Sequence, residues 1–216
     1  MGWLQLCLNA RKFIRMALFE IEQIRRSISE HSPAQFPVRK KTTQAAVSIV
    51  LRPGKKDTQA LFILRATKDG DPWSGHMAFP GGHYEVSDDS LRHTAERETW
   101  EEIGLDLTGT AQYIGQIDPV RANPRGRNLD MIVTPFVYEL SVPEVSFNPN
   151  YEVADVLWGS LREMHEGSSH TMGEFVVGGQ TVNYPGYAVD DEIVWGLTYR
   201  MIDLFFTALD PGWVER

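Results

Sequence analysis

The chain has 216 residues, of which 42% are hydrophobic and 23% charged, and its formal net charge is −8. This composition is typical of one globular domain, and the acidity argues against broad electrostatic binding of nucleic acid. A single cysteine, Cys7, excludes a disulfide framework and a multi-cysteine zinc site, and it favours an intracellular location. No stretch approaches the roughly 20 apolar residues that a bilayer-spanning helix needs, so no membrane partner is expected.

The beginning of the chain, residues 1–40, is predicted to be an extension ahead of one main domain over residues 41–216. The opening stretch is basic, and it lacks the small-residue cleavage site that follows the apolar run of a secretory signal. We therefore expect a cytoplasmic protein, and import into an organelle through this basic stretch is the alternative. A translation start at Met16 would equally account for the extension.

An amphipathic helix that packs on the main domain is predicted over residues 17–31, because apolar side chains recur there at helical spacing. These side chains are Leu18, Ile21, Ile24 and Ile28. The segment 31–41 is polar and interrupted by prolines, which predicts a linker.

The main domain is predicted to contain a mixed sheet. Its predicted strands are rich in β-branched and apolar residues, and they span residues 44–51, 60–66, 112–117, 131–140 and 152–158. A turn at 52–59 and the segment 173–184 predict two hairpins, and the apolar stretch 193–209 predicts a long buried helix. The predicted fold class is α+β, an α/β/α sandwich with helices on both faces of the sheet.

One segment of the main domain concentrates negative charge. Between Glu85 and Asp106 there are eight carboxylates and two arginines, so this segment carries −6 of the chain's −8. Such crowding is destabilising unless a bound group offsets the repulsion. The segment therefore indicates a binding site for a cation.

A helix is predicted over residues 90–103. Asp88, Asp89 and Ser90 are good N-cap types for its start, and Gly104 is a stop signal at its end. On this helix Glu98, Glu101 and Glu102 lie at i, i+3 and i+4 and point to one side. Three carboxylates on one face suit a hard divalent cation such as Mg²⁺ or Mn²⁺. A solvated acidic face is the alternative, although such faces usually mix charges of both signs.

Two neighbouring features support the cation site. Arg97 precedes Glu98 and is expected to orient a carboxylate through a bidentate hydrogen bond. The sequence FPGG, residues 79–82, predicts a tight turn whose glycines let backbone amides and carbonyls approach a metal ion or a phosphate closely.

The stretch RETWEEIGL, residues 97–105, resembles the second half of the Nudix box, except that Thr99 stands where a bulky apolar residue is usual. The spacing from Gly82 to Glu98 is one residue longer than in that pattern, and counting back from the helix places Asp89 at the box's first glutamate. Together with Gly75, the FPGG turn and the later IVWGLTYRMI, this pattern is similar to the coenzyme A diphosphatase-like branch of Nudix hydrolases.

The resemblance implies a Nudix fold with a mixed β-sheet between helices, and a Mg²⁺ or Mn²⁺ cofactor. It implies that Glu98 and Glu102 bind the metal directly, that Glu101 binds it or acts as a base, and that the Gly82 carbonyl completes the ligand set. Arg97 is expected to hold Glu98 in place. The general base stays open among four carboxylates: Glu101, Glu139, Glu144 and Glu152.

Four residues are expected to bind the substrate. Arg65 belongs to an upstream motif of the coenzyme A branch, whose second arginine is missing here. Trp73 precedes the glycine turn and is a candidate for stacking on a base or sugar, with packing on the sheet edge as the alternative. Arg125 and Arg127 lie in the loop 120–130 between two predicted strands, which is suited to binding phosphate or base, with a solvated loop of scattered charge as the alternative.

The function implied by the resemblance is metal-dependent hydrolysis of the diphosphate of coenzyme A or its derivatives, giving 4'-phosphopantetheine and 3',5'-ADP. The missing second arginine keeps a second substrate class open, namely nucleoside diphosphate sugars or other nucleoside diphosphates. A Nudix-fold module that binds a nucleotide without hydrolysing it is a third possibility. The expected partner is a small nucleoside diphosphate derivative, and a homodimer is compatible with the sequence.

Overall fold

The structure, a computed structural model, describes residues 19–214 except 56, 69–72, 123–129 and 178. The predictions on Cys7, on the basic N-terminus and on Met16 therefore lie outside the described residues. The elements in chain order are α2 (Ile21–Glu30), β1 (Thr43–Pro53), β2 (Thr58–Arg65), β3 (Met77–Ala78), β4 (Gly81–His83), α3 (Leu91–Ile103), α4 (Leu107–Thr110), β5 (Ala111–Gln116), β6 (Val120–Ala122), β7 (Met131–Leu140), β8 (Val153–Ser160), α5 (Leu161–Glu166), β9 (His170–Val177), β10 (Gln180–Val189), β11 (Glu192–Trp195) and α6 (Gly196–Leu209).

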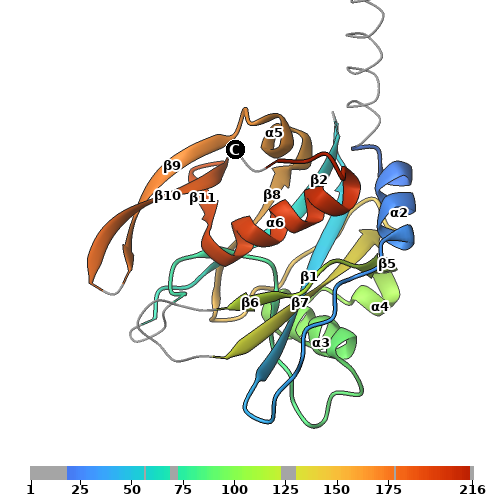
Figure 1. The fold of residues 1–216 in the computed structure, drawn as a ribbon. Helices are drawn as coiled ribbons and strands as arrows, with labels where there is room; N and C mark the ends of the chain where they lie inside the picture. The colour runs from blue at the N-terminus through green and yellow to red at the C-terminus, as the bar shows by residue number, and fades with distance from the viewer. Residues whose placement is uncertain (1–18, 56, 69–72, 123–129, 178, 215–216) are drawn as a thin grey trace, which may run out of the picture.

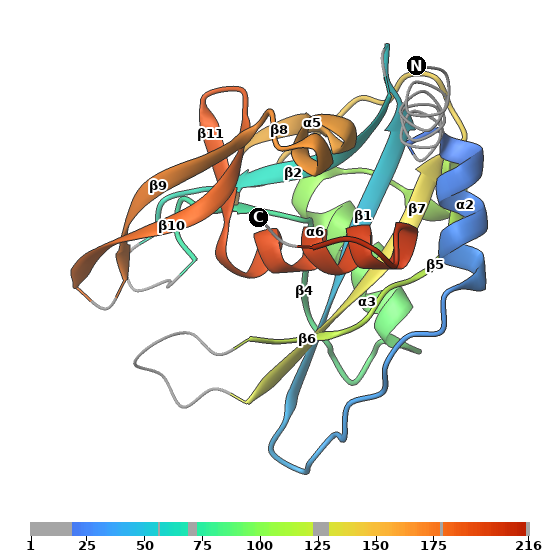
Figure 2. The same ribbon diagram turned by 45° about the horizontal axis from the view of Figure 1, so that its top comes forward.

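The central sheet is mixed, as predicted. Strand β1 pairs in parallel with β7 along most of its length and antiparallel with β2 and β4. The remaining strands β3 and β8 join β2, and β5 and β6 join β7, all antiparallel. Helix α6 crosses one face of this sheet and α3 lies on the other (Figures 1 and 2). The α/β/α arrangement predicted from the sequence is therefore confirmed.

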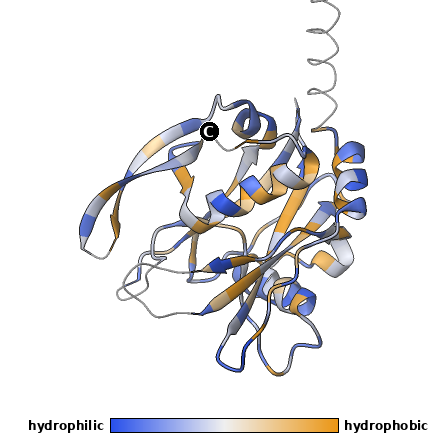
Figure 3. Cartoon of the chain, viewed as in Figure 1, coloured by the Kyte–Doolittle hydropathy of each residue, from blue (hydrophilic) through white to orange (hydrophobic). Residues whose placement is uncertain are grey.

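The residues of β1 explain why both faces of the sheet are covered. Side chains on β1 alternate between two hydrophobic clusters, with Val47 and Ile49 in the cluster under α6 and Ala46 and Val50 in the cluster under α3. A strand buried on both faces reads as a nearly continuous apolar run, and residues 45–51 are apolar except for Ser48. Figure 3 shows the hydrophobic colouring concentrated on the central strands and on α6.

Helix α2 packs on the same face as α6. Its buried residues are Ile21, Ile24 and Ile28, and they belong to the core cluster under α6. On the partly exposed side of the helix, Arg25 donates two hydrogen bonds of 2.8 and 3.0 Å to the carboxylate of Glu139 on β7. The polar segment that follows α2 has no regular secondary structure up to residue 42. The domain boundary at residue 40 stays a prediction.

The prediction of one helix over residues 193–209 is wrong at its start. Residues 192–195 form β11, in which Val194 pairs with Tyr187 and Trp195 with Gly186 of β10. Trp195 has an extended backbone, and Gly196 adopts φ of +62°, a left-handed conformation that glycine accepts without strain. Periodicity does not distinguish an apolar strand from the adjoining buried helix, and this pairing with β10 is a tertiary contact.

A second sheet of three strands, in the order β11–β10–β9, stands beside the first. Its β9–β10 hairpin, predicted within residues 173–184, projects away from the central sheet (Figure 1). None of the helices in the described residues is long and apolar enough to cross a bilayer.

Candidate active site

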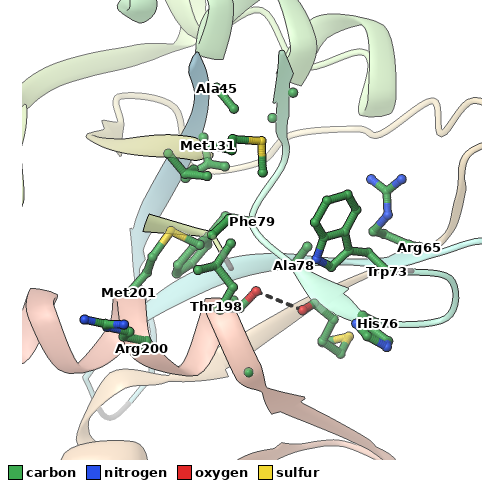
Figure 4. Close-up of a pocket in the computed structure, with 18 of the residues that line it drawn as sticks. Ala45, Arg65, Trp73, His76, Ala78, Phe79, Met131, Thr198, Arg200 and Met201 are labelled. Atoms are coloured by element: carbon green, nitrogen blue, oxygen red, sulfur yellow. Dashed lines mark hydrogen bonds between the residues drawn. The ribbon is translucent and has the colours of Figure 1, made fainter. Parts of the chain in front are cut away.

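A cleft of about 1060 Å³ lies between the carboxylate side of α3 and the beginning of α6. Its walls come from α3, β2, the β3–β4 turn, β6, β7 and the small sheet. Figure 4 shows part of this wall, with Arg65 and Trp73 on one side and Arg200 and Met201 on the other. The lining includes acidic residues from three segments, Glu85, Glu98, Glu102 and Glu152.

Helix α3 is defined at both ends by its own sequence. The Ser90 hydroxyl accepts a hydrogen bond from the His93 backbone N–H, and Gly104 closes the helix at φ of +68°. Thr99 replaces the usual bulky apolar residue and is fully buried, where its hydroxyl lies 2.9 Å from the equally buried hydroxyl of Ser48 on β1. This polar pair satisfies both hydroxyls and fixes α3 against β1.

The glycine turn allows the central sheet to approach α3 closely. A Cβ atom on Gly81 would lie 2.2 Å from the carbonyl oxygen of Ala46, and Gly81 has φ of +153°. A Cβ atom on Gly82 would lie 2.4 Å from the carboxyl carbon of Glu98. A side chain at position 81 would therefore clash with the backbone of β1, and a side chain at position 82 would clash with the carboxyl group of Glu98.

Glu102 is the most deeply buried carboxylate of the cleft, at 3% exposure. It accepts a hydrogen bond of 2.9 Å from the Gly81 N–H, and its other oxygen lies 3.7 Å from an Arg65 nitrogen. Burial raises the pKa of Glu102 to about 8, against the lowering influence of these two partners. An ionised Glu102 thus requires more positive charge than the described side chains supply.

Arg97 is the centre of an ion network under the turn. Its guanidinium donates bidentately to Asp88, at 2.9 and 3.1 Å, and also to Glu98 at 3.0 Å and Glu101 at 3.1 Å. It donates a fifth bond to the backbone carbonyl of His83. Arg97 therefore bonds to Glu98 and connects α3 to the glycine turn, and its predicted role of orienting Glu98 as a ligand stays a prediction.

The assignment of Asp89 to the first acidic position of the Nudix box is wrong. Asp88 is buried, and its carboxylate accepts from Arg97, from the Thr94 hydroxyl and from the Glu85 N–H. Asp89 is exposed. Counting forward from Gly82 by the spacing of the box places its first acidic position at Asp88. The extra residue of this chain therefore lies after Asp88, between Asp88 and Arg97.

The substitution Asp88→Asn is expected to destabilise the protein at pH 7 by roughly 3 kcal/mol, because it leaves Arg97 without its buried partner. Arg97 holds the pKa of Asp88 well below its usual range. The stability contributed by this carboxylate is therefore complete above the unfolded pKa of about 3.9 and is lost as the pH falls further. The difference in unfolding free energy between wild type and variant should narrow below about pH 4, measured by denaturant titration.

The matched control is Asp89→Asn at the neighbouring, exposed position, which should change stability by less than about 0.5 kcal/mol at any of these pH values. Equal effects of the two substitutions would contradict the assignment of Asp88 to the buried position.

The three glutamates predicted on one face of α3 are not equivalent in the structure. Glu98 and Glu102 line the cleft, whereas the Glu101 side chain is 52% exposed and turned toward Arg97. Within the described part of the chain, no three acidic, histidine or cysteine side chains form a cluster with the geometry of a metal site. Arg97 accounts for this, because it draws one oxygen of Glu98 and one of Glu101 to itself.

The donor chemistry of the cleft nevertheless fits a divalent cation. Glu98 and Glu102 are largely buried carboxylates whose pKa values are raised, in both cases chiefly by burial. The backbone of Gly82 lies against the Glu98 carboxylate without an intervening side chain. Oxygen donors of this kind suit Mg²⁺ or Mn²⁺, and a cation would offset the cost of ionising both groups. The individual ligand roles of Glu98, Glu101, Glu102 and Gly82 stay predictions.

The four candidates for the general base occupy different places. Glu152 lines the cleft, and the pKa of Glu102 is raised in part by its charge. Its backbone is held by Ala66 and by the side chain of Asn150. Glu139 is bound to Arg25, and neither Glu139 nor Glu144 is part of the cleft wall.

The structure gives the positions of two of the four predicted substrate-binding residues, and their roles stay predictions. Arg65 and Trp73 both line the cleft, on the same side of it (Figure 4). Trp73 is also packed against the core cluster under α6, so it has part of the packing role given as its alternative. Arg125 and Arg127 lie outside the described residues.

Among the cleft-wall residues that were not predicted from the sequence are two charged side chains and one aromatic side chain. Glu85 follows the glycine turn, Trp195 ends β11, and Arg200 lies in the second turn of α6. Glu85 was visible only as one acid among eight. Trp195 and Arg200 were included in an apolar helix that was expected to be buried, so no local signal placed them at the cleft.

Comparison with known proteins gives a consistent assignment. The NUDIX domain family matches residues 42–176, which is more than half of the chain. An uncharacterized protein of Schizosaccharomyces pombe is 36% identical over 107 residues, covering 48% of this chain and 32% of that protein. The mitochondrial coenzyme A diphosphatase NUDT8 of Mus musculus is 27% identical over 180 residues, covering 82% of this chain and 83% of the relative.

Among solved structures, a MutT/nudix family protein from Enterococcus faecalis superposes with a TM-score of 0.55 at 17% identity, over 82% of this chain and 66% of that chain. At this identity the likeness shows the fold alone. The domain match and the relatives support a pyrophosphohydrolase, and dependence on a divalent metal is general among such enzymes. The chain therefore belongs to the NUDIX domain family.

Proposed function

We propose that this protein is a divalent-metal-dependent diphosphatase that cleaves the diphosphate of coenzyme A or its derivatives to 4'-phosphopantetheine and 3',5'-ADP. The observation that carries this proposal is the cleft whose lining combines the carboxylates of Glu98 and Glu102 with apolar side chains of the core. A named coenzyme A diphosphatase that matches over most of both chains supports the same substrate class. Its mitochondrial name supports the organellar alternative to the cytoplasmic location expected from the sequence.

In this proposal Glu98 and Glu102 hold the cation, with the Gly82 carbonyl beside them and Glu101 as a further ligand. A bound Mg²⁺ or Mn²⁺ supplies positive charge that neutralises the diphosphate and lowers the pKa of water. Arg97 orients Glu98, so it acts through the ligand rather than on the substrate. Arg65 lies near Glu102 and is positioned to contact a diphosphate oxygen.

We assign the activation of water to Glu152. Its side chain lines the cleft and is 36% exposed, so water can reach it. Lys68 lies 3.9 Å from its carboxylate. Glu101 stays the second candidate, because the resemblance allows a base from the box and its side chain is accessible.

A second substrate class, the nucleoside diphosphate sugars, is favoured by one observation. The upstream motif lacks its second arginine, which in the coenzyme A branch stands between Arg65 and Gly75. If that arginine contributes to binding of the additional phosphate of coenzyme A, its loss relaxes the preference for that substrate.

A substrate panel with Mg²⁺ and with Mn²⁺ tests the proposal. It should contain coenzyme A, acetyl-coenzyme A, ADP-ribose, a UDP-sugar and a GDP-sugar, with products resolved by chromatography. We expect 3',5'-ADP to be released and coenzyme A to lead in kcat/KM. A lead for a nucleotide sugar would replace the substrate class, and the absence of all turnover would leave a nucleotide-binding module.

A further inference from the structure

We propose that Arg200 on α6 binds a phosphate group that the substrate carries away from its diphosphate, such as the 3'-phosphate of coenzyme A. This inference rests on the proposed function and deepens it, because it names a residue that separates 3'-phosphorylated substrates from others. The missing arginine of the upstream motif would then be replaced by a cation from a different element.

The first observation is the state of the arginines in the cleft wall. Arg65 lies 3.7 Å from Glu102, and Arg121 is bonded to Asp130. Arg200 is exposed, and no carboxylate among the described residues forms an ion pair with it. Of these three guanidinium groups, Arg200 is thus the one whose charge is not already matched within the described part of the chain.

The second observation is its position. Arg200 lies at the α6 end of the cleft, across from Arg65 and Trp73 (Figure 4). Phe79 lies between these two sides in Figure 4, and the cleft lining also includes the apolar side chains of Met77, Val133 and Met201. The cleft therefore has the carboxylate of Glu102 beside Arg65 on one side and the guanidinium of Arg200 on the other, with apolar side chains in its lining.

This order of polarity matches one half of coenzyme A. The diphosphate belongs at the carboxylate end, where a cation neutralises it. The adenosine has an apolar face that suits the methionine and phenylalanine wall. The 3'-phosphate is a phosphomonoester with a charge between −1 and −2, and a guanidinium binds such a group through two parallel hydrogen bonds.

The test compares coenzyme A with dephospho-coenzyme A, which differ only in the 3'-phosphate. For Arg200→Gln we expect the KM for coenzyme A to rise roughly 10- to 100-fold, the size of a lost charge-assisted hydrogen bond, with little change in kcat. The KM for dephospho-coenzyme A should stay within about twofold, since that substrate lacks the group. Arg200→Lys should recover part of the loss through its charge.

The control is Arg26→Gln, which removes an exposed arginine on α2 outside the cleft and should affect neither substrate. An equal rise in KM for both substrates would mean that Arg200 contacts the diphosphate or stabilises the fold. Unchanged kinetics would mean that Arg200 is a solvated side chain without a role in binding. Either result overturns the inference while the hydrolase activity stands.

If the wild type hydrolyses neither substrate, the proposed function fails, and calorimetry still decides the role of Arg200. The wild type should then bind 3',5'-ADP more tightly than 5'-AMP, and Arg200→Gln should abolish that difference. No preference in the wild type, or a preference that survives the substitution, would overturn the inference.

Discussion

Glu102→Gln is expected to lower kcat by roughly 100-fold or more with either metal. The glutamine preserves the volume of the side chain and can still accept the hydrogen bond from the Gly81 N–H, so the loss comes from the negative charge.

The fold should survive this substitution. Burial raises the pKa of Glu102 to about 8 in the absence of a cation. A carboxyl group whose pKa is raised on folding lowers stability above its unfolded pKa of about 4.3, and a neutral amide removes that cost. The metal-free variant should therefore be as stable as the wild type at pH 7 or more stable.

Steady-state kinetics, Mn²⁺ binding by calorimetry and thermal unfolding together check this prediction. The matched control is Glu96→Gln on the same helix, whose side chain accepts from the Tyr138 hydroxyl outside the cleft. It should retain activity within about threefold, because the charge that it removes is not part of the cleft lining. Near-normal turnover of Glu102→Gln would remove this residue from the predicted metal ligands.

Gly82→Ala is expected to lower kcat/KM by about 100-fold while the protein stays folded. The new methyl group would occupy space now filled by the carboxyl group of Glu98, 2.4 Å from its carbon atom. The clash involves the end of the flexible Glu98 side chain, which can rotate away without a shift of the backbone. The predicted metal ligand is then displaced from the cleft.

Gly81→Ala provides the contrast, because its Cβ would meet backbone atoms of β1 and its φ of +153° is strained for other residues. We expect a stability loss of roughly 3 kcal/mol or more for Gly81→Ala and of less than about 1 kcal/mol for Gly82→Ala. Circular dichroism melts and the same kinetic assay separate the two. The prediction is contradicted if Gly82→Ala is fully active or if it unfolds as readily as Gly81→Ala.

The sequence alone determined the elements whose signals are local. Residues 44–51 predicted a strand because they are rich in β-branched and apolar side chains, and they lie within β1. Ser90 and Gly104 bounded α3 through capping and a left-handed closing residue, which depend on a few neighbouring residues. The carboxylates of α3 followed from helical periodicity, which repeats wherever a helix forms.

Only the tertiary structure decided what depends on segments far apart in the chain. Asp88 rather than Asp89 became the partner of Arg97, because one of the two carboxylates is buried under the glycine turn. Likewise Glu152 lines the cleft, whereas Glu139 forms an ion pair with Arg25 of α2.

The same limit applies to the α6 end of the cleft. The apolar run 193–209 does not by itself indicate whether its first residues pair with a strand. Residues 192–195 form β11 because they pair with β10. That pairing starts α6 at Gly196 and brings Arg200 to the cleft. Residue types and spacing determined the chemistry of the acidic helix, and the packing of distant segments decided which side chains surround it, since burial and pairing are properties of the folded chain.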